Sequence, residues 1–361
     1  MTTVLMVSGS WPPEACGVGD YTEKLCRELE RTDIDVVRFG DDGLSRVYSR
    51  ETIRQASQTD CDIVHIQYPT AGYGRSLTPS ALPASMRNKP VVVTLHEYSV
   101  FRWYRRAWFA PFARNCAARI FTTEEERRLF ESRFPSRGGL DMTVGIASNI
   151  AAVAKVAREA NRVAYFGLIA PHKGIEAFLD LCEIARAASS DLTFELIGAI
   201  PEMCRGYAET VLQRASACSV QLTTDMPDDA VARRLATATF AYLPYPDGAS
   251  GKRGTLAAAL VNNLVVITRH SDITPDWIRT ATLDAKGHLE AFKVLTRLQA
   301  DTRRLEAAVQ QSALASSRFR WDEIALRHAD LYRSLLEGAD KRRRAAAAPS
   351  ASASLEARMA S

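Results

Sequence analysis

The stretch SGSWPPEACGVGDYTEKLCREL, residues 8–29, joins a strand-like run to a helical pattern and sets the architecture of the chain. The run before it, Thr3–Val7, is short, apolar and partly β-branched, which favours a strand. Within the stretch, Tyr21, Leu25 and Leu29 recur every four residues, which favours one apolar face of a helix. The sequence therefore predicts a strand, a glycine-containing turn and a helix near its start.

Two glycines, Gly17 and Gly19, stand where that helix begins. The first turn of a helix has unpaired N–H groups and a positive dipole end, so the position favours an anion such as phosphate. The strict dinucleotide pattern G-x-G-x-x-G is not met, because its last position is Thr22. Two interpretations stay open here: an anion-binding turn, and glycines that serve only a tight turn. A nicotinamide-dependent dehydrogenase is disfavoured, since no acidic residue follows at a convincing ribose position.

Strand-like runs continue to alternate with helical patterns, in two blocks. The first block has them at 4–7, 36–39, 63–67, 91–95, 119–121 and 142–144, and the second at 163–166, 193–197, 219–222, 239–243 and 264–267. This alternation predicts parallel sheets with crossover helices, an α/β fold with a ligand cleft at the strand ends. We expect an N-terminal domain over 1–150, a second domain over 151–315, a helix over 316–337 and a disordered tail over 338–361.

Composition and charge exclude several classes of protein. With 361 residues, of which 47% are hydrophobic and 24% charged, the chain is typical of a globular protein of two domains. The net charge of +4 gives no reason to expect a nucleic-acid partner. The seven cysteines form no C-x-x-C pair, which disfavours a disulfide framework and a structural zinc site. Without a signal sequence or a long apolar stretch, we expect a cytoplasmic protein, at most peripheral on the inner face of a membrane.

Two cationic segments of the second block have the form of phosphate-binding loops. In YFGLIAPHKGIEAF, residues 165–178, a strand leads through a loop to Lys173 at a helix start, where an ammonium group can reach a phosphate. A solvated surface lysine is the alternative. In LPYPDGASGKRGTLAAALVNNLVVIT, residues 243–268, another helix start gathers Ser250, Lys252, Arg253, Gly254 and Thr255. Cations oppose the helix dipole there, so this pattern favours a bound anion over a solvated charge cluster.

These segments, in this order, resemble the GT-B glycosyltransferases of the large retaining group-one family over about residues 1–337. The resemblance rests on PPEACGVGDYT in the first loop, VHIQY and VVVTLHEY in the first domain, YFGLIAPHKG opening the second, and FRWDEIALRHADLYRSLL as the closing helix. It implies two facing Rossmann-like domains with a nucleotide-sugar in the cleft. The resemblance also implies roles for individual residues. Gly17 and Gly19 would lie near the donor diphosphate, His96 near the transferred sugar, and Lys173 on a phosphate. Trp321 and Tyr332 would dock the last helix onto the first domain.

The chain departs from that family at three positions. The arginine that many relatives carry after the strand-end glycine is Leu168 here, and the two glutamates separated by seven residues are Ser250 and Ala258. The carboxylates that grip the sugar and the ribose are therefore absent. Our hypothesis is that Lys252 and Arg253 supply the missing phosphate charge, while Ser250 and neighbouring amides hold the sugar.

The residues that are present can support the expected chemistry without a cofactor. In front-face displacement, the leaving phosphate can take the acceptor proton, so the protein has to stabilise charge on the diphosphate and hold both substrates together. Cationic side chains and helix dipoles can do this without a metal. The D-x-D at Asp33–Asp35 precedes an early strand in a connecting region, which disfavours a metal site there.

The segment VFRWYRRAWFAPFAR, residues 100–114, interleaves arginines with aromatic residues. Such a segment can lie in the headgroup region of an anionic membrane, with Arg102, Trp103, Arg105 and Arg106 on the acceptor side of the cleft. An amphipathic helix packed on the sheet is the equal alternative, because amphipathicity alone does not distinguish the two.

The function expected from all these features is transfer of a sugar from a nucleoside diphosphate sugar to a hydroxyl of a glycan or lipid-linked acceptor, in polysaccharide or glycoconjugate biosynthesis. A catalytically silent GT-B subunit that binds a partner is the second reading, because the glutamates are missing. A nucleotide-sugar isomerase of the same fold is the third.

Overall fold

The computed structural model describes residues 2–14, 16–86, 89–135, 140–154 and 156–347. The chain divides into two compact units. One contains the residues up to Val144 together with those from Ile324 onward, and the other is Gly145–Glu323. The division lies at 144 rather than 150, because the residues that follow pack on the second unit: the Ser148 N–H donates to the Phe319 carbonyl at 2.9 Å.

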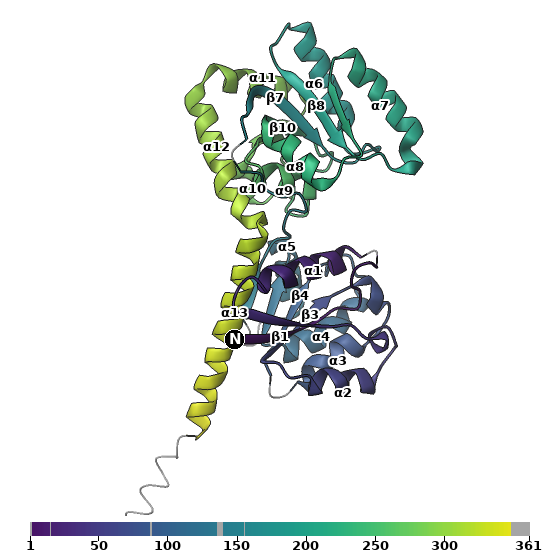
Figure 1. Ribbon diagram of the computed structural model, residues 1–361, viewed down its shortest axis with the longest axis vertical. Coiled ribbons are helices and arrows are strands. Elements are labelled where there is room, and N and C mark those ends of the chain that lie inside the picture. The colour runs from purple at the N-terminus through teal and green to yellow at the C-terminus, as the bar shows by residue number, and fades with distance from the viewer. Residues whose placement is uncertain (1, 15, 87–88, 136–139, 155, 348–361) are drawn as a thin grey trace, which may run out of the picture. The chain divides into compact units, whose positions relative to one another are not determined.

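The first unit is a parallel six-stranded sheet in the order β2-β1-β3-β4-β5-β6. Figure 1 labels β1, β3 and β4 of this sheet. Its strands are β1 (Thr2–Val7), β2 (Ile34–Phe39), β3 (Ile63–Tyr68), β4 (Val91–Leu95), β5 (Ala118–Phe121) and β6 (Leu140–Thr143). Its helices are α1 (Gly17–Leu29), α2 (Arg50–Gln58), α3 (Thr78–Ser85), α4 (Ala110–Asn115), α5 (Glu124–Arg133) and most of α13 (Trp321–Ala347). The strand order reverses beside β1, so β1 and β3 flank a topological switch point.

Alternation along β3 separates the two faces of this sheet. Val64, Ile66 and Tyr68 point into the apolar core that contains the buried side chains of α2 to α5. His65 and Gln67 point to the opposite face, and His65 there meets Tyr332 of α13. The strand therefore presents apolar residues to one side and a polar pair to the other.

The second unit is also a parallel six-stranded sheet, in the order β12-β11-β10-β7-β8-β9. Counted from β7, this is the Rossmann order 3-2-1-4-5-6, whose switch point lies between β7 and β10. The strands are β7 (Glu159–Phe166), β8 (Thr193–Gly198), β9 (Gln221–Thr224), β10 (Ala238–Leu243), β11 (Val265–Thr268) and β12 (Leu283–Asp284). The helices are α6 (Ile175–Ala187), α7 (Arg205–Ala217), α8 (Asp228–Thr237), α9 (Gly254–Val261), α10 (Asp276–Ala281), α11 (His288–Ala300) and α12 (Thr302–Ser316).

Two apolar cores cover the faces of the second sheet. Phe240 and Tyr242 of β10 join one core with α6, α7 and α11, whereas Ala241 and Leu243 join the other with α8, α9 and α10. Residues that alternate along one strand thus enter opposite layers, as in a doubly wound sheet.

The last helix is longer than the sequence pattern predicts. The sequence pattern predicts that the helix ends at residue 337 and that a disordered tail follows, but α13 runs to Ala347. The extension contains lysine, arginines and alanines, which favour helix strongly enough to continue through Gly338. The rest of the predicted tail, residues 348–361, lies outside the described residues.

Candidate functional site

A pocket of about 650 Å³ opens at the switch point of the second unit, at the C-terminal ends of β7 and β10. Its walls come from the segment before β7, the strand-end loops, and the starts of α8 and α9. The residues that line it include Asn149, Ile150, Tyr165, Leu168, His172, Lys173, Asp228, Tyr245, Lys252, Arg253, Gly254 and Thr255. Open α/β sheets bind ligands at this place, and the volume is in the range of small-molecule sites.

Two helices begin beside this pocket without a side-chain cap. The N-cap of α6 is Gly174 and that of α9 is Arg253, and neither makes a side-chain capping bond. Their first-turn N–H groups are therefore available to a ligand, and both dipoles present their positive ends. Helix starts of this kind favour an anion.

Lys173 is held by an unusual loop backbone. His172 before it and Gly174 after it both have positive φ, at 62° and 84°. The Tyr165 hydroxyl donates to the Lys173 carbonyl at 3.0 Å, which fixes the loop on the end of β7. A Cβ at position 174 would lie 2.1 Å from the Pro244 carbonyl oxygen, so only glycine lets α6 begin this close to the end of β10.

Arg253 is held in place by groups beside the pocket. Its guanidinium forms an ion pair with Asp247 and lies over the Tyr245 ring at 4.9 Å. The Tyr245 hydroxyl is 2.7 Å from Thr255 Oγ1, and burial raises the pKa of Tyr245 far enough to keep it neutral. The Nε–H of Arg253 is buried and has no partner among the described residues. The cation is thus oriented by protein contacts, and one donor is left over.

The charge of the pocket suits an anionic ligand with a polar body. Lys173, Lys252 and Arg253 line it, and Asp228 is the acidic residue among the lining side chains. Asp247 lies next to the pocket and partly balances Arg253. The cationic excess at two helix starts can neutralise a diphosphate.

Five of the six predicted donor-binding residues of the second unit line this pocket: Lys173, Lys252, Arg253, Gly254 and Thr255. Ser250 is not one of the lining residues. Its carbonyl accepts a hydrogen bond from the Arg253 N–H at 3.2 Å, so it shapes the turn before α9. At the other two positions where the chain departs from the family, Leu168 lines the pocket, whereas Ala258 is fully buried in the apolar core.

Sequence reasoning missed the two tyrosines and the acid of this site. Tyr165 and Tyr245 occupy strand ends, where an aromatic residue is read as core. Asp247 lies in the PDG turn, and acidic residues are common in turns. In the sequence, the only indication that Asp247 and Arg253 form an ion pair is their short separation across a glycine-containing turn.

In the first unit, Gly17 and Gly19 serve α1 differently. Gly17 is exposed, and among the described residues no atom lies within 4 Å of where its Cβ would be. A Cβ on Gly19 would lie 2.8 Å from the Ser10 carbonyl oxygen, so Gly19 is required for packing. Burial raises the pKa of the N-cap thiol of Cys16, but hydrogen bonds from Ala71, Gly19, Val18 and Ser10 outweigh it, and the pKa is lowered. The start of α1 therefore stabilises negative charge.

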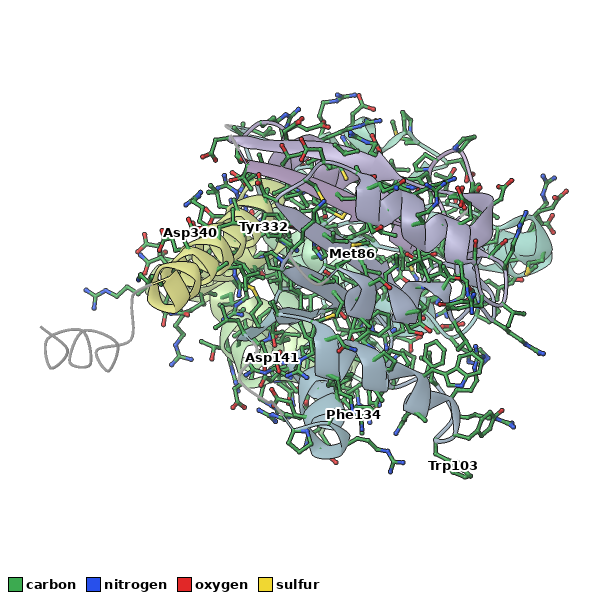
Figure 2. All side chains as sticks on the ribbon, turned by 90° about the horizontal axis from the view of Figure 1, so that it is seen from below. Met86, Trp103, Phe134, Asp141, Tyr332 and Asp340 are labelled. Carbon is green, nitrogen blue, oxygen red and sulfur yellow. The ribbon has the colours of Figure 1, made fainter. Side chains whose placement is uncertain are left out.

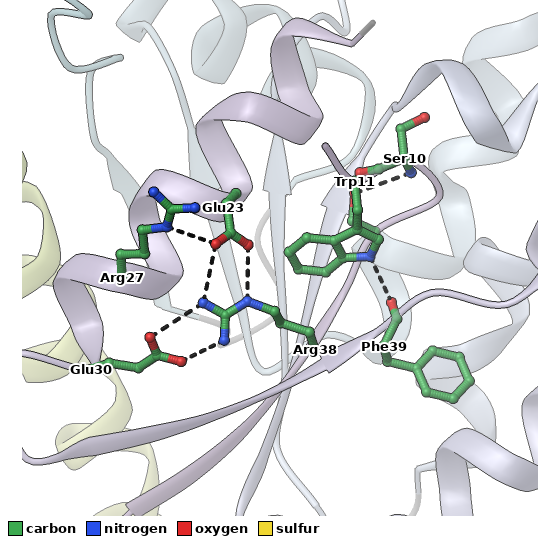
Figure 3. A network of polar contacts seen from close by, with 8 residues as sticks. Ser10, Trp11, Glu23, Arg27, Glu30, Arg38 and Phe39 are labelled. Atoms are coloured by element: carbon green, nitrogen blue, oxygen red, sulfur yellow. Dashed lines mark hydrogen bonds and ion pairs between the residues drawn. The ribbon is translucent and has the colours of Figure 1, made fainter. Parts of the chain in front are cut away.

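Figure 3 shows how α1 is anchored to β2. Arg38 of β2 pairs with Glu23 at 2.9 Å and with Glu30 at 2.5 Å, and Glu23 also pairs with Arg27 at 2.8 Å. These ion pairs, which lie between the middle of the helix and its C-cap, fix the orientation of α1 on the sheet.

His96 lies directly after β4 and is 4% exposed. Its Nε2 is 2.9 Å from Gln67 Oε1, and its ring meets Tyr21 of α1 edge-on at 5.1 Å. Burial lowers the pKa of His96 to about 3, with a smaller effect from His328, so the ring is neutral at pH 7. A neutral imidazole here is a hydrogen-bonding group rather than a cation. Its predicted place beside the transferred sugar, and the sharing of one donor site by both units, stay predictions.

The arginine and aromatic segment of residues 100–114 does not form one amphipathic helix. It contains a 3-10 turn, η3 (Arg105–Phe109), followed by α4, and Phe109 and Phe112 are buried. Trp103 is 77% exposed, and Figure 2 shows it pointing away from the sheet. Arg105 stacks on Phe101 and Trp108, while Arg106 donates to the carbonyls of Phe101 and Ser99.

Neither a metal-binding cluster nor a membrane-spanning helix is found within the described ranges. No group of three or more His, Cys, Asp or Glu side chains there is arranged to hold a metal ion. Likewise, no helix in that part of the chain has the length and apolar character needed to cross a bilayer.

Comparisons with known proteins identify the fold. The model of the family described as Glycosyltransferase Family 4 matches residues 37–139. A glycosyltransferase from Rickettsia africae ESF-5 superposes with a TM-score of 0.63 at 10% identity, over 93% of this chain and 98% of that one. Anabaena HepE, solved with UDP, gives a TM-score of 0.61 at 14% identity, over 92% of this chain and 100% of its own. The chain has the GT-B fold. The predicted resemblance to GT-B glycosyltransferases is thereby confirmed.

Sucrose-phosphate synthase from Thermosynechococcus elongatus, at 14% identity and a TM-score of 0.58, aligns with 94% of this GT-B chain and 100% of its own. The comparison with curated protein sequences gave no match.

Proposed function

We propose that this GT-B protein transfers a sugar from a nucleoside diphosphate sugar to a hydroxyl of a glycan or lipid-linked acceptor. The observation that carries the proposal is the pocket at the β7/β10 switch point. It combines two uncapped helix starts with Lys173, Lys252 and Arg253, which suits a diphosphate. The relative HepE was solved with UDP and with UDP-glucose, which supports a uridine donor as the first to test.

The proposed reaction is a front-face displacement with retention. The acceptor oxygen forms a bond to the anomeric carbon, the bond from that carbon to the β-phosphate oxygen breaks, and the acceptor proton passes to the leaving phosphate. Charge grows on the diphosphate during this step, and cations fixed at helix starts stabilise it more than the ground state. The lysines, Arg253 and the helix N–H groups supply that charge, so the proposal includes no metal ion.

A panel of nucleoside diphosphates tests the donor site. UDP, GDP, dTDP and ADP are added separately, and the unfolding temperature is measured, because a ligand that binds only the folded state raises it. We expect one of the four nucleotides to raise the unfolding temperature most, and that nucleotide is UDP if the donor resembles that of HepE. A panel without any rise would contradict the proposal at its first step.

A catalytically silent GT-B subunit is the second candidate, favoured by the buried Ala258 and by Leu168 in the pocket wall. Such a subunit could still bind a nucleotide, so binding does not distinguish the two. Release of UDP from UDP-sugars, with and without a mixture of glycan and polyprenyl-phosphate-linked acceptors, does distinguish them. Acceptor-dependent UDP release supports the enzyme, and nucleotide binding with no turnover supports the silent subunit.

We further propose that the first unit meets an anionic membrane at the cytoplasmic face through Trp103 and its neighbours. Val100 and Tyr104 are also at least half exposed, and Arg102 is exposed beside them, which suits insertion at the headgroup level. Trp103→Ala should reduce pelleting with vesicles that contain phosphatidylglycerol. Met203→Ala, an exposed apolar residue of the second unit, is the matched control and should pellet like the wild type. Pelleting that does not depend on anionic lipid would refute this proposal.

A further inference from the structure

A row of buried polar side chains runs from His96 to the last helix inside the first unit. His96 Nε2 lies 2.9 Å from Gln67 Oε1. Gln67 Nε2 lies 3.3 Å from His65 Nε2, and His65 Nδ1 lies 2.6 Å from the Tyr332 hydroxyl. All four side chains are at most 4% exposed. Buried polar groups without partners are costly, so this row has to be satisfied within the protein.

The register of the sheet brings these groups together. In the parallel pair β3 and β4, Gln67 stands opposite Thr94. His65 and Gln67 are two residues apart on β3, as Thr94 and His96 are at the end of β4, so all four face the same side. Thr94 Oγ1 accordingly lies 2.8 Å from His65 Nε2.

The orientation of the Gln67 amide follows from a neighbour that can only accept. Gln67 Nε2 lies 3.4 Å from the Met6 sulfur, and a thioether has no hydrogen to donate. The amide nitrogen therefore faces Met6 and His65, and the amide oxygen faces His96. An amide oxygen can only accept, so the proton of the His96 ring is on Nε2.

With the proton on Nε2, the other nitrogen of His96 is an acceptor. Nδ1 carries the lone pair and has no hydrogen-bond partner among the residues that the structure describes. A sugar hydroxyl can donate to such a nitrogen, whereas a phosphate oxygen cannot.

We propose that Gln67 is a positioning residue that holds His96 as its neutral Nε2–H tautomer, so that Nδ1 accepts a hydrogen bond from a substrate hydroxyl. This inference rests on the proposed transferase function and deepens it, because it assigns to Gln67 the control of which His96 nitrogen faces the substrate.

The surroundings of His96 keep its ring neutral over the working pH range. The titratable groups packed around it are Tyr21 on α1, His65 on β3 and His328 on α13. Burial lowers the pKa of His65 and His328 as well, and Arg327 on α13 acts on His328 in the same direction. The carboxylate that would make His96 an imidazolium is absent from this set. The activity of the wild type should therefore not change through protonation of His96 between about pH 5.5 and about pH 8.5.

Nuclear magnetic resonance of the ¹⁵N-labelled full chain tests the tautomer without any substrate. Nitrogen shifts and couplings to the ring protons distinguish Nε2–H from Nδ1–H, and His96→Asn assigns the signal. We expect the Nε2–H form in the wild type and a mixture in Gln67→Leu. The Nδ1–H form in the wild type would overturn the proposal, and this outcome is independent of whether the chain transfers sugar.

Kinetics with two replacements of Gln67 test the role. Gln67→Leu loses one buried hydrogen bond to His96 and should lower kcat by about tenfold, with the donor KM within about twofold. Gln67→Glu places a carboxylate on Nε2–H and raises the pKa of His96, so that Nδ1 is protonated at low pH. Activity of this variant should then rise with pH through the raised pKa, unlike that of the wild type.

Thr94→Val is the matched control. It removes the hydroxyl beside His65 Nε2 and leaves the His96 to Gln67 hydrogen bond intact. This variant should keep both the tautomer and the flat pH profile, and unfolding temperatures check that each variant folds. A Gln67→Glu profile that matches the wild type, or a Gln67→Leu kcat equal to that of Thr94→Val, would refute the positioning role.

Discussion

Gly174→Ala should destabilise the second unit by about 3 kcal/mol and remove most of its affinity for a nucleoside diphosphate. An alanine in the left-handed region, with φ at 84°, carries a steric cost of its own. The larger cost comes from the Pro244 carbonyl oxygen, which would lie 2.1 Å from the new Cβ. This is a backbone atom, so the start of α6 has to move away from the end of β10. Urea unfolding and titration with UDP measure the two effects.

Gly206→Ala is the matched control for that prediction. Gly206 lies in the first turn of α7, and no described atom lies within 4 Å of its absent Cβ. Alanine favours helix over glycine, so this variant should be as stable as the wild type or up to about 1 kcal/mol more stable. Equal urea midpoints for Gly174→Ala and the wild type would contradict the close approach of α6 to β10.

The architecture was predictable because local patterns and tertiary structure agree. The apolar run around Val4–Val7 predicts a strand, the helix phase of Tyr21 and Leu25 predicts a helix, and the second strand block predicts a second sheet. Parallel pairing follows from the alternation of strands and helices. The cases that failed are local. The strand expected at 219–222 begins later, because Ser219 is in the left-handed region with φ at 54° and ends the preceding turn. The two-residue strand β12 is too short to leave any pattern.

The site residues were predictable only where they stand at a chain position that the sequence pattern itself marks, such as the start of a helix. Lys173 and Arg253 stand at helix starts, which the sequence marks with glycines, so their place in the pocket follows from the pattern. Gln67 and Asp247 could not be found in this way, because their roles depend on a side chain from another strand or on a turn conformation. The same limit explains Gly17 and Gly19: both have the same sequence signal, and the structure alone shows that Gly19 packs against Ser10.

Arg253→Ala should lower kcat/KM for the donor by about 100-fold, since a charge-assisted contact to phosphate that strengthens in the transition state is worth roughly 2–4 kcal/mol. The guanidinium is already oriented by Tyr245 and Asp247, so the contact needs little reorganisation when the donor arrives. Steady-state kinetics with the donor identified by the nucleotide panel measure the effect. Lys173→Ala should cause a similar loss from the other helix start, and an unchanged kcat/KM for Arg253→Ala rules out the phosphate role.

Asp247→Asn separates that role from a structural one. If Arg253 serves only to hold the loop through its ion pair, removing the carboxylate should impair the enzyme as much as removing the arginine does. If Arg253 serves the diphosphate, Asp247→Asn removes a competing anion from beside the guanidinium, and donor affinity should stay equal or increase. The stacking on the Tyr245 ring remains in this variant, so the cation keeps its orientation. If Arg253→Ala raises the donor KM and Asp247→Asn does not, the guanidinium of Arg253 binds the diphosphate. If both substitutions lower kcat/KM to the same extent, Arg253 only holds the loop through its ion pair.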